Sequence, residues 1–245
     1  DHLQIRTVYK VRDVVTLNQR ANSLLGKAMM GLEYLLFRTG PLTMAPSQLG
    51  LFAYSDASEK TPDLEYHVQP LSLDKFGDPL HKFPAFTASV LDLRPKSRGH
   101  IIIRDSNPGS APRIVLNYLS HEDDRLKAAR GLRLTRRIVS QPALAPFRPV
   151  EHLPGTEFSS DEQLAFAAGN VGTTIFHPVG TCRMGREEEA SAVTDSRLRV
   201  LGLSGLRVVD ASIMPTITSG NTSSPTIMIA TQGARMIRSD RSKKQ

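Results

Sequence analysis

The chain has 245 residues, of which 40% are hydrophobic and 22% charged, and its formal net charge is +7. This length and composition are enough to bury a hydrophobic core in one or two domains, which excludes a disordered or low-complexity protein. The cationic side chains are spread among acidic ones, outside two clusters at 133–137 and 238–244. The charge therefore does not indicate a nucleic-acid partner.

The sequence offers no membrane-spanning or secretory signal. No stretch approaches the roughly 18 consecutive apolar residues that a transmembrane helix needs. Residues 1–6 have neither the basic head nor the apolar middle of a signal peptide. The single cysteine, Cys182, excludes an internal disulfide and fits a reducing compartment. We therefore expect a cytoplasmic protein, or one held peripherally at the inner membrane, and the oligomeric state stays open.

The first half of the chain predicts strands and one helix. Alternating β-branched residues predict a strand at 5–11, and apolar residues at helical spacing predict one helix over 21–38. Further strands are predicted at 64–73, 83–93, 100–105 and 113–118. The turn at 95–99 predicts that 83–93 and 100–105 pair with each other in antiparallel fashion. This pattern is typical of an α+β fold, with an antiparallel sheet flanked by helices.

The second half predicts helices separated by turns. A capping box at Ser120–Asp123 predicts a helix that runs to Val139, and Ser159–Glu162 predicts a short helix that ends near residue 168. A strand is predicted at 206–209 and a last helix at 225–238. The sequence has no Gly-x-Gly-x-x-Gly, Gly-x-Ser-x-Gly or P-loop motif and no His/Cys cluster at metal spacing. Hydrolase and metalloenzyme functions are therefore not indicated, and we expect no metal.

Three turns rich in glycine and proline contain the candidate site residues. His177 is followed by Pro178-Val179-Gly180, and its apolar neighbours partly desolvate the imidazole. Desolvation favours the neutral imidazole, which accepts a proton near physiological pH. A core histidine that binds backbone groups is the alternative interpretation.

Asp210 and Asn221 lie in the other two turns. Asp210 follows the strand predicted at 206–209, and ligands of open α/β sheets bind beyond the carboxyl ends of strands. Asn221 precedes the last predicted helix, where free backbone N–H groups and the helix dipole attract negative charge. A capping or turn role explains either residue equally well when it is considered alone.

Taken together, these segments resemble the C-terminal half of the glucose–methanol–choline (GMC) family of flavin oxidoreductases. Asp1-His2-Leu3 is similar to the end of a family segment, Asn-Leu-Gln-Asp-His-Leu, and residues 91–103 resemble strands of its substrate domain. The similarity covers nearly the whole chain. The motifs that carry it are His177-Pro178-Val179-Gly180-Thr181-Cys182-Arg183-Met184-Gly185, then Val209-Asp210-Ala211-Ser212-Ile213-Met214-Pro215, and finally Asn221-Thr222-Ser223-Ser224-Pro225-Thr226-Ile227-Met228-Ile229-Ala230.

Members of this family bind FAD in an N-terminal Rossmann-type domain and oxidise alcohols to aldehydes or ketones by hydride transfer to the flavin. The resemblance implies that this chain begins after the nucleotide-binding part and binds FAD poorly by itself. It further implies that residues 5–171 form the substrate-binding domain. Residues 172–240 would then form an active-site and flavin-lining segment, whose strand and helix return to the FAD domain.

The resemblance also implies roles for individual residues. His177 matches the family's catalytic base, and Asn221 matches its partner at the substrate oxygen. The positions that match FAD contacts are Asp210, Ala211, Asn221 and Thr222.

The substrate implied by the resemblance is a small alcohol. Choline-specific members resemble this chain at Thr39-Gly40 and carry a glutamate further along, where this chain has Gln48. An amide attracts a quaternary ammonium group weakly, and the sequence has no tryptophan for an aromatic cage. We therefore expect a less polar primary alcohol, with choline ranked lower and the electron acceptor left open. A non-catalytic binding module derived from the same domain is the alternative function.

Overall fold

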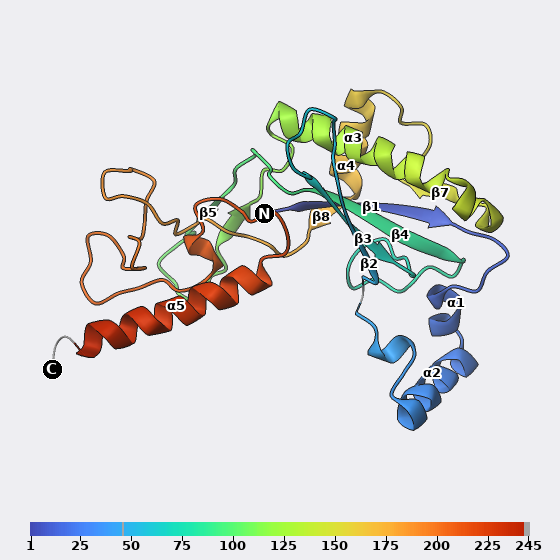
Figure 1. Cartoon of the computed structure of the whole chain (residues 1–245), viewed down its shortest axis with the longest axis horizontal. Helices are drawn as coiled ribbons and strands as arrows, with labels where there is room; N and C mark the ends of the chain where they lie inside the picture. Colours follow the sequence, from blue (N-terminus) through green and yellow to red (C-terminus); the bar gives the residue numbers. More distant parts are fainter. Residues whose placement is uncertain (46, 243–245) are drawn as a thin grey trace. The chain divides into compact units, whose positions relative to one another are not determined.

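The structure is a computed structural model that describes residues 1–45 and 47–242 (Figure 1). It divides into two compact units. The sheet unit consists of Leu3–Asp92 and Leu119–Thr173, and the motif unit consists of Asp1–His2, Leu93–Tyr118 and the residues from Thr174 onward. Residues 93–118 thus group with the C-terminal residues, whereas the sequence placed them within 5–171. The functional domains at 5–171 and 172–240 stay a prediction.

The sheet unit is built on one antiparallel sheet. Its strands run in the order β2-β3-β4-β1-β7, and β8 pairs with β1. At its centre Val90 of β4 lies opposite Ile5 of β1 on one side and Tyr66 of β3 on the other. The antiparallel sheet and the α+β class predicted from the sequence are confirmed. The strands are β1 (Leu3–Lys10), β2 (Leu49–Ala53), β3 (Leu64–Gln69), β4 (Ala85–Asp92), β7 (Val150–Leu153) and β8 (Gly172–Thr174).

Two helices, α3 (Glu122–Val139) and α4 (Asp161–Val171), pack on one face of this sheet (Figure 1). Leu132 of α3 and Leu164 of α4 are buried with Ile5 and Val90 in the core of the unit. Ser160 and Gln163 form the capping box that begins α4. The predicted capping box at Ser120 is wrong, because α3 begins one residue later and the ring of His121 accepts a hydrogen bond from the N–H of Asp123.

The helix predicted at 21–38 is two helices, α1 (Leu17–Asn22) and α2 (Leu24–Phe37). Ser23 has an extended backbone and separates them, and its hydroxyl accepts a hydrogen bond from the N–H of Gly26. A serine that caps a new helix competes with continuation of the old one. The short helix η1 (Pro41–Thr43) follows, and η2 (Pro142–Phe147) precedes β7.

The motif unit contains the hairpin of β5 (His100–Ile102) and β6 (Arg113–Val115), the short helix η3 (Ala211–Ile213) and the long helix α5 (Ser223–Ser242). The strand predicted at 100–105 pairs with β6 and not with the strand at 83–93, so that predicted pairing is wrong. The edges of β4 are already occupied by β1 and β3. None of the helices in the described part of the chain is long and apolar enough to cross a membrane.

Candidate active site

The loop that carries His177 is fastened by one carboxylate. Asp1 Oδ2 accepts hydrogen bonds from the hydroxyls of Tyr118 at 2.5 Å and Thr174 at 2.6 Å. Asp1 Oδ1 accepts a third, from the backbone N–H of His177 at 3.0 Å. Burial raises the pKa of the Tyr118 phenol, which therefore stays protonated and donates. Hydrogen bonds to a charged acceptor are among the stronger ones, so the backbone at His177 is well fixed.

The side chain of His177 lies against a second histidine. Its Nδ1 is 3.0 Å from Nδ1 of His2, and the two rings meet edge to face with centroids 5.3 Å apart. His177 is 8% exposed and His2 is fully buried. His2 was missed as a site residue, because the sequence shows only that Asp1-His2-Leu3 resembles a family segment and does not show which residue it contacts.

The partners of His2 determine which nitrogen of His177 accepts a proton. Nε2 of His2 lies 3.1 Å from the carbonyl oxygen of Leu93, which only accepts hydrogen bonds, so this nitrogen carries a hydrogen. In a neutral His2 the Nδ1 atom is then the acceptor, and Nδ1 of His177 must donate to it. This tautomer of His177 has no hydrogen on Nε2, which leaves that atom able to take a proton.

The three sequence motifs come together in the motif unit. The N–H groups of Cys182 and Met184 donate to the carbonyls of Ser212 and Ile213, at 3.0 and 2.7 Å. Helix α5 contributes Ile229 to the same small core. The buried members of this core are Leu198, Ile213, Met214 and Ile229. The motif segments that are far apart in the sequence thus share one core, as expected for one site.

Asp210 is exposed and caps a short helix. The strand predicted at 206–209 is wrong, because only Arg207 forms an isolated bridge there, with Arg199. A strand needs a partner of comparable length to pair with. Asp210 Oδ1 accepts hydrogen bonds from the N–H and the hydroxyl of Ser212, at 2.8 and 2.5 Å, and so begins η3. Its partners in these two bonds are local, and Ala211 follows it as the first residue of η3.

Asn221 and Thr222 lie directly before α5. Asn221 is exposed and follows Gly220, whose φ of 152° belongs to the region that favours glycine. Thr222 is buried, and its carbonyl accepts a hydrogen bond from the N–H of Thr226. Among the residues that the structure describes, no hydrogen bond joins Asn221 to His177. Asn221 is therefore available to a ligand at the N-terminus of a long helix, and its partnership with His177 stays a prediction.

Gln48 lies in the sheet unit, just before β2. Its side chain is exposed and donates to the carbonyl of Ala45 at 2.5 Å, while its backbone N–H donates to Val68 at 2.9 Å. The structure thus places Gln48 at an edge strand, and its role as a substrate-lining residue stays a prediction.

The face of the sheet away from α3 and α4 is unusually polar. Side chains alternate along a strand, so Gln4 and Arg6 point away from the face on which Ile5 meets the helices. The neighbouring strands place Glu65, Gln69 and Ser89 on this same face, at the registers that pair with or flank Arg6. These five side chains, which we call the polar face, are all at least nine-tenths buried.

The polar face holds polar atoms that have no hydrogen-bond partner among the described residues. Two of them are Nε and Nη1 of the Arg6 guanidinium, whose Nη2 donates to the carbonyl of Leu73 at 3.4 Å. Burial of an unsatisfied polar group typically costs about 1–3 kcal/mol, and a charged one costs more. Their number on one face leaves this surface with unmet hydrogen-bonding capacity. The other atoms are Gln4 Oε1, Glu65 Oε2, Gln69 Oε1 and Ser89 Oγ.

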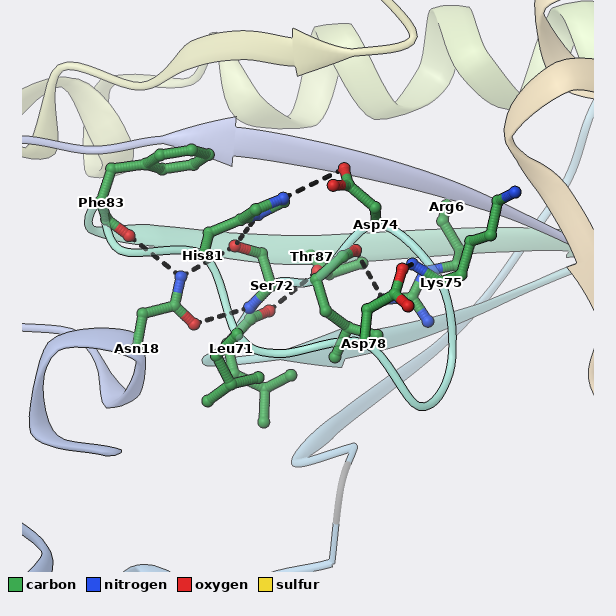
Figure 2. A network of polar contacts seen from close by, with 12 residues as sticks. Arg6, Asn18, Leu71, Ser72, Asp74, Lys75, Asp78, His81, Phe83 and Thr87 are labelled. Atoms are coloured by element: carbon green, nitrogen blue, oxygen red, sulfur yellow. Dashed lines mark hydrogen bonds and ion pairs between the residues drawn. The ribbon is translucent and has the colours of Figure 1, made fainter. Parts of the chain in front are cut away.

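The loop at 70–84 lies beside this face and is anchored at its ends (Figure 2). Asn18 Nδ2 donates to the hydroxyl of Ser72 at 2.8 Å, and His81 lies 2.9 Å from that hydroxyl and 3.1 Å from Asp74. Serine, histidine and aspartate in this order resemble a hydrolase triad, but Ser72 is fully buried. The network therefore holds the loop, and the buried Ser72 hydroxyl does not serve as a nucleophile. At the loop tip, the ring of Phe76 lies 4.6 Å from the Arg6 guanidinium.

Comparisons with curated proteins identify relatives along most of the chain. It is 38% identical over 229 residues to an oxygen-dependent choline dehydrogenase from Brucella ovis, a match that covers 94% of this chain and 42% of the relative. It is 40% identical over 238 residues to an oxygen-dependent choline dehydrogenase from Escherichia coli O157:H7, covering 97% of this chain and 42% of that protein. The chain thus spans less than half the length of these relatives.

Solved structures share the fold. A pyridoxine 4-oxidase from Mesorbium loti superposes with a TM-score of 0.77 at 28% identity, covering 96% of this chain and 42% of that one. A formate oxidase variant from Aspergillus oryzae superposes with a TM-score of 0.86 at 22% identity, over 99% of this chain and 47% of that one, and at that identity it supports the fold alone.

The family resemblance is confirmed by a direct match. Residues 95–230, which contain all three motifs and exceed half of the chain, match the family described as GMC oxidoreductase. Together with the motif core and the relatives, this match shows that the chain belongs to the GMC oxidoreductase family.

Proposed function

We propose that this chain works as the C-terminal part of a longer FAD-dependent oxidoreductase that oxidises an alcohol to an aldehyde or ketone. The observation that carries the proposal is the 3.0 Å contact between Nδ1 of His2 and Nδ1 of His177, which supports Nε2 of His177 as the proton acceptor. A binding module without catalysis has no need of a histidine whose tautomer is set in this way. The family and the names of the relatives support the same chemistry.

The residues present fit the polar edge of the isoalloxazine ring of a flavin. Asn221 is exposed before the N-terminus of the 20-residue helix α5, where first-turn N–H groups and the helix dipole favour negative charge. Asn221, Thr222 and these N–H groups would hold the polar edge of the ring, with Asp210 and Ala211 as further contacts. When bound, FAD would supply the hydride acceptor.

The chain's own residues supply the proton chemistry. His177 Nε2 would take the hydroxyl proton of the alcohol, which makes the adjacent hydride easier to release. The imidazolium formed in this step keeps its Nδ1–H bond to His2, and the Asp1 carboxylate holds the backbone beneath it. Asn221 would donate a hydrogen bond to the substrate oxygen. A base and an orienting partner in hydrogen-bond contact are the usual geometry for such a transfer.

We propose that the polar face binds a ligand with acceptor oxygens. Arg6 is a buried cation with two unsatisfied donors, so an acceptor such as a carboxylate would complete it. The unsatisfied atoms are sealed from solvent, so the ligand would reach them when the loop that carries Phe76 moves aside.

The experiment that tests the proposal follows the flavin in the full-length gene product. Rapid mixing with an alcohol under anaerobic conditions should bleach the flavin absorbance near ~450 nm. His177→Ala should slow this reduction about 100-fold or more, while His100→Ala, which changes an exposed histidine of β5, should leave it unchanged. Equal rates in wild type and His177→Ala would remove His177 from the mechanism. A full-length product that takes up no FAD would support the non-catalytic binding module instead.

A further inference from the structure

A pocket lies beyond the C-terminal end of β1, within the sheet unit. Its volume is about 380 Å³, inside the range of about 300–1,000 Å³ that is typical of small-molecule sites. Val11, which directly follows β1, lines this pocket, and Figure 1 shows the chain running on from there into α1. His2 precedes the first residue of β1. The pocket therefore lies at the opposite end of this strand from His2, and nothing proposed above uses it.

The walls of the pocket are almost entirely apolar. They come from several segments of the sheet unit, including the loop after β1, the start of β4 and the short helix η2. The ring of Phe86 is held in place by stacking on the buried ring of Tyr9, with centroids 5.5 Å apart. Such walls bind the apolar part of a ligand by removing it from water. The larger apolar side chains in the lining are Val11, Leu17, Met44, Phe86, Leu144 and Phe147.

Backbone hydrogen bonds hold these walls together. The N–H of Arg12 donates to the carbonyl of Phe147 at 2.9 Å, which joins the loop after β1 to η2. The N–H of Leu17 donates to the carbonyl of Pro70 at 3.3 Å, which joins the start of α1 to the end of β3. The lining segments are thus positioned without a ligand. A preformed site lowers the cost of ordering the protein when a ligand binds.

One cation stands at this apolar pocket. Among the described residues that line it, Arg20 is the one that carries a charge. Its side chain is exposed and forms no ion pair within the described part of the chain. Asp13, an acid of the loop between β1 and α1, is already paired with Arg148 at 3.5 Å. The pocket thus offers a planar guanidinium beside apolar walls, and a carboxylate matches the donors of that group.

We infer that this pocket binds an apolar monocarboxylate, with its apolar part among the lining side chains and its carboxylate on Arg20. A single cation balances a single negative charge, which favours a carboxylate over a phosphate ester. The polar face differs from this pocket, because Arg6 is buried there among other polar side chains. The inference rests on the shape, lining and charge of the pocket and is independent of the flavin chemistry proposed above.

The test follows the methyl group of Met44 by NMR in the full-length gene product, with isotope-labelled methionine methyl groups. Met44 lines the pocket, and Met44→Leu identifies its signal by removing it. Octanoate should shift this signal until the site is saturated, while the signal of Met214, buried in the core of the motif unit, should stay unchanged. Hexanoate and butanoate should each bind about ten-fold more weakly than the next longer acid, because fewer CH₂ groups enter the pocket.

Variants separate the charge from the apolar walls. Arg20→Met should weaken octanoate binding about 2- to 5-fold, the contribution of an exposed ion pair, and leave the binding of octanol within about two-fold. Lys27→Met, which removes an exposed cation outside the lining, should leave both affinities unchanged. Leu144→Trp should fill the pocket and weaken both ligands about ten-fold or more. Thermal unfolding checks that each variant folds, and Arg20→Met still tests the site if Leu144→Trp does not fold.

Two results would overturn the inference. If octanoate leaves the Met44 signal unchanged, the pocket is closed to small molecules, and the rest of the polypeptide or a second copy fills it. If octanoate and octanol bind equally well and Arg20→Met affects neither, the site does not select a carboxylate. The Met44 signal reports this pocket alone, so neither a carboxylate at the polar face nor a failure of the flavin reaction changes the outcome.

Discussion

His2 and His177 are 175 residues apart in the sequence, and their Nδ1 atoms lie 3.0 Å apart in the structure. The pair joins the Leu93 carbonyl, the buried His2 ring and the base proposed at His177 into one chain of hydrogen bonds. In the proposed reaction, His2 would act through His177 as a positioning residue. It would fix the tautomer of His177 and share the charge that His177 gains.

We predict that His2→Ala slows flavin reduction about 10- to 100-fold, since His177 loses the acceptor for its Nδ1–H. The imidazolium form of His177 is then less stable, so the acidic limb of the pH–rate profile should shift to lower pH. A variant that only disturbs packing would not move this limb of the profile. The measurement is flavin reduction against pH in the full-length product, with thermal unfolding as a check on folding. An unchanged pH profile together with an unchanged rate would contradict the role of His2.

Elements with both periodicity and end signals are predicted well from the sequence. The last helix was expected at 225–238 and spans Ser223–Ser242, and the helix expected to start within Ser159–Glu162 is α4, which begins at Asp161. The break at Ser23 was not predicted, because apolar residues continue at helical spacing across it. The strand predicted at 206–209 does not form, because strand formation depends on a neighbour, which local sequence does not reveal.

The candidate site is only partly readable from the sequence for the same reason. The motifs around His177, Asp210 and Asn221 are contiguous and were recognised. His2 and the polar face are not contiguous, since they depend on register between β1, β4 and β3. From the sequence, Arg6 cannot be distinguished from an ordinary strand arginine, because only the structure reveals its burial and its unsatisfied donors.

Arg6 gives a prediction about ligand binding at the polar face. Wild type should bind benzoate more tightly than neutral benzyl alcohol. Arg6→Met should weaken benzoate binding about 10- to 100-fold, because one or two charge-assisted hydrogen bonds are lost, and should leave the binding of benzyl alcohol within a few-fold. Arg12→Met, at an exposed position, is the matched control. Equal losses for both ligands would show that Arg6 supports the fold and does not select the ligand.

Lys127 gives a prediction about pH. Its Nζ lies 3.1 Å from Asp63 Oδ2 and 3.6 Å from Asp92 Oδ1. Burial alone would raise the pKa of Asp63, but hydrogen bonds from Ser55 and the Lys127 ammonium outweigh it and hold that pKa below its usual value. A depressed carboxyl pKa stabilises the fold above the unfolded value of about 3.9, and this stabilisation is lost as the pH falls through the folded value.

We therefore expect Lys127→Met to lower the free energy of unfolding at pH 7 by about 1–3 kcal/mol. The difference from wild type should shrink as the pH falls below about 4 and through the depressed pKa of folded Asp63, until that carboxyl is protonated in both proteins. Lys60→Met, at an exposed lysine, should be nearly neutral at every pH. The check is denaturant unfolding at several pH values, and a difference that does not depend on pH would assign the loss to packing alone.

Replacing a helical glycine by alanine should lower stability at Gly233 and raise it at Gly31. A Cβ on Gly233 of α5 would lie 2.5 Å from Cγ1 of Val209, so α5 approaches the 208–214 segment as closely as it does only because this side chain is absent. Gly233→Ala should destabilise the motif unit by about 1–3 kcal/mol, and Asp210, one residue beyond Val209, would move with the segment.

Gly31 of α2 has nothing within 4 Å of the same added atom, so Gly31→Ala should raise stability by up to about 1 kcal/mol through helix propensity. Hydrogen exchange resolved by segment would show loosened protection around 208–214 in the first variant and strengthened protection of α2 in the second. If both variants gain stability, α5 does not pack on Val209 as closely as described. The described packing of the three motif segments in one core would then be wrong.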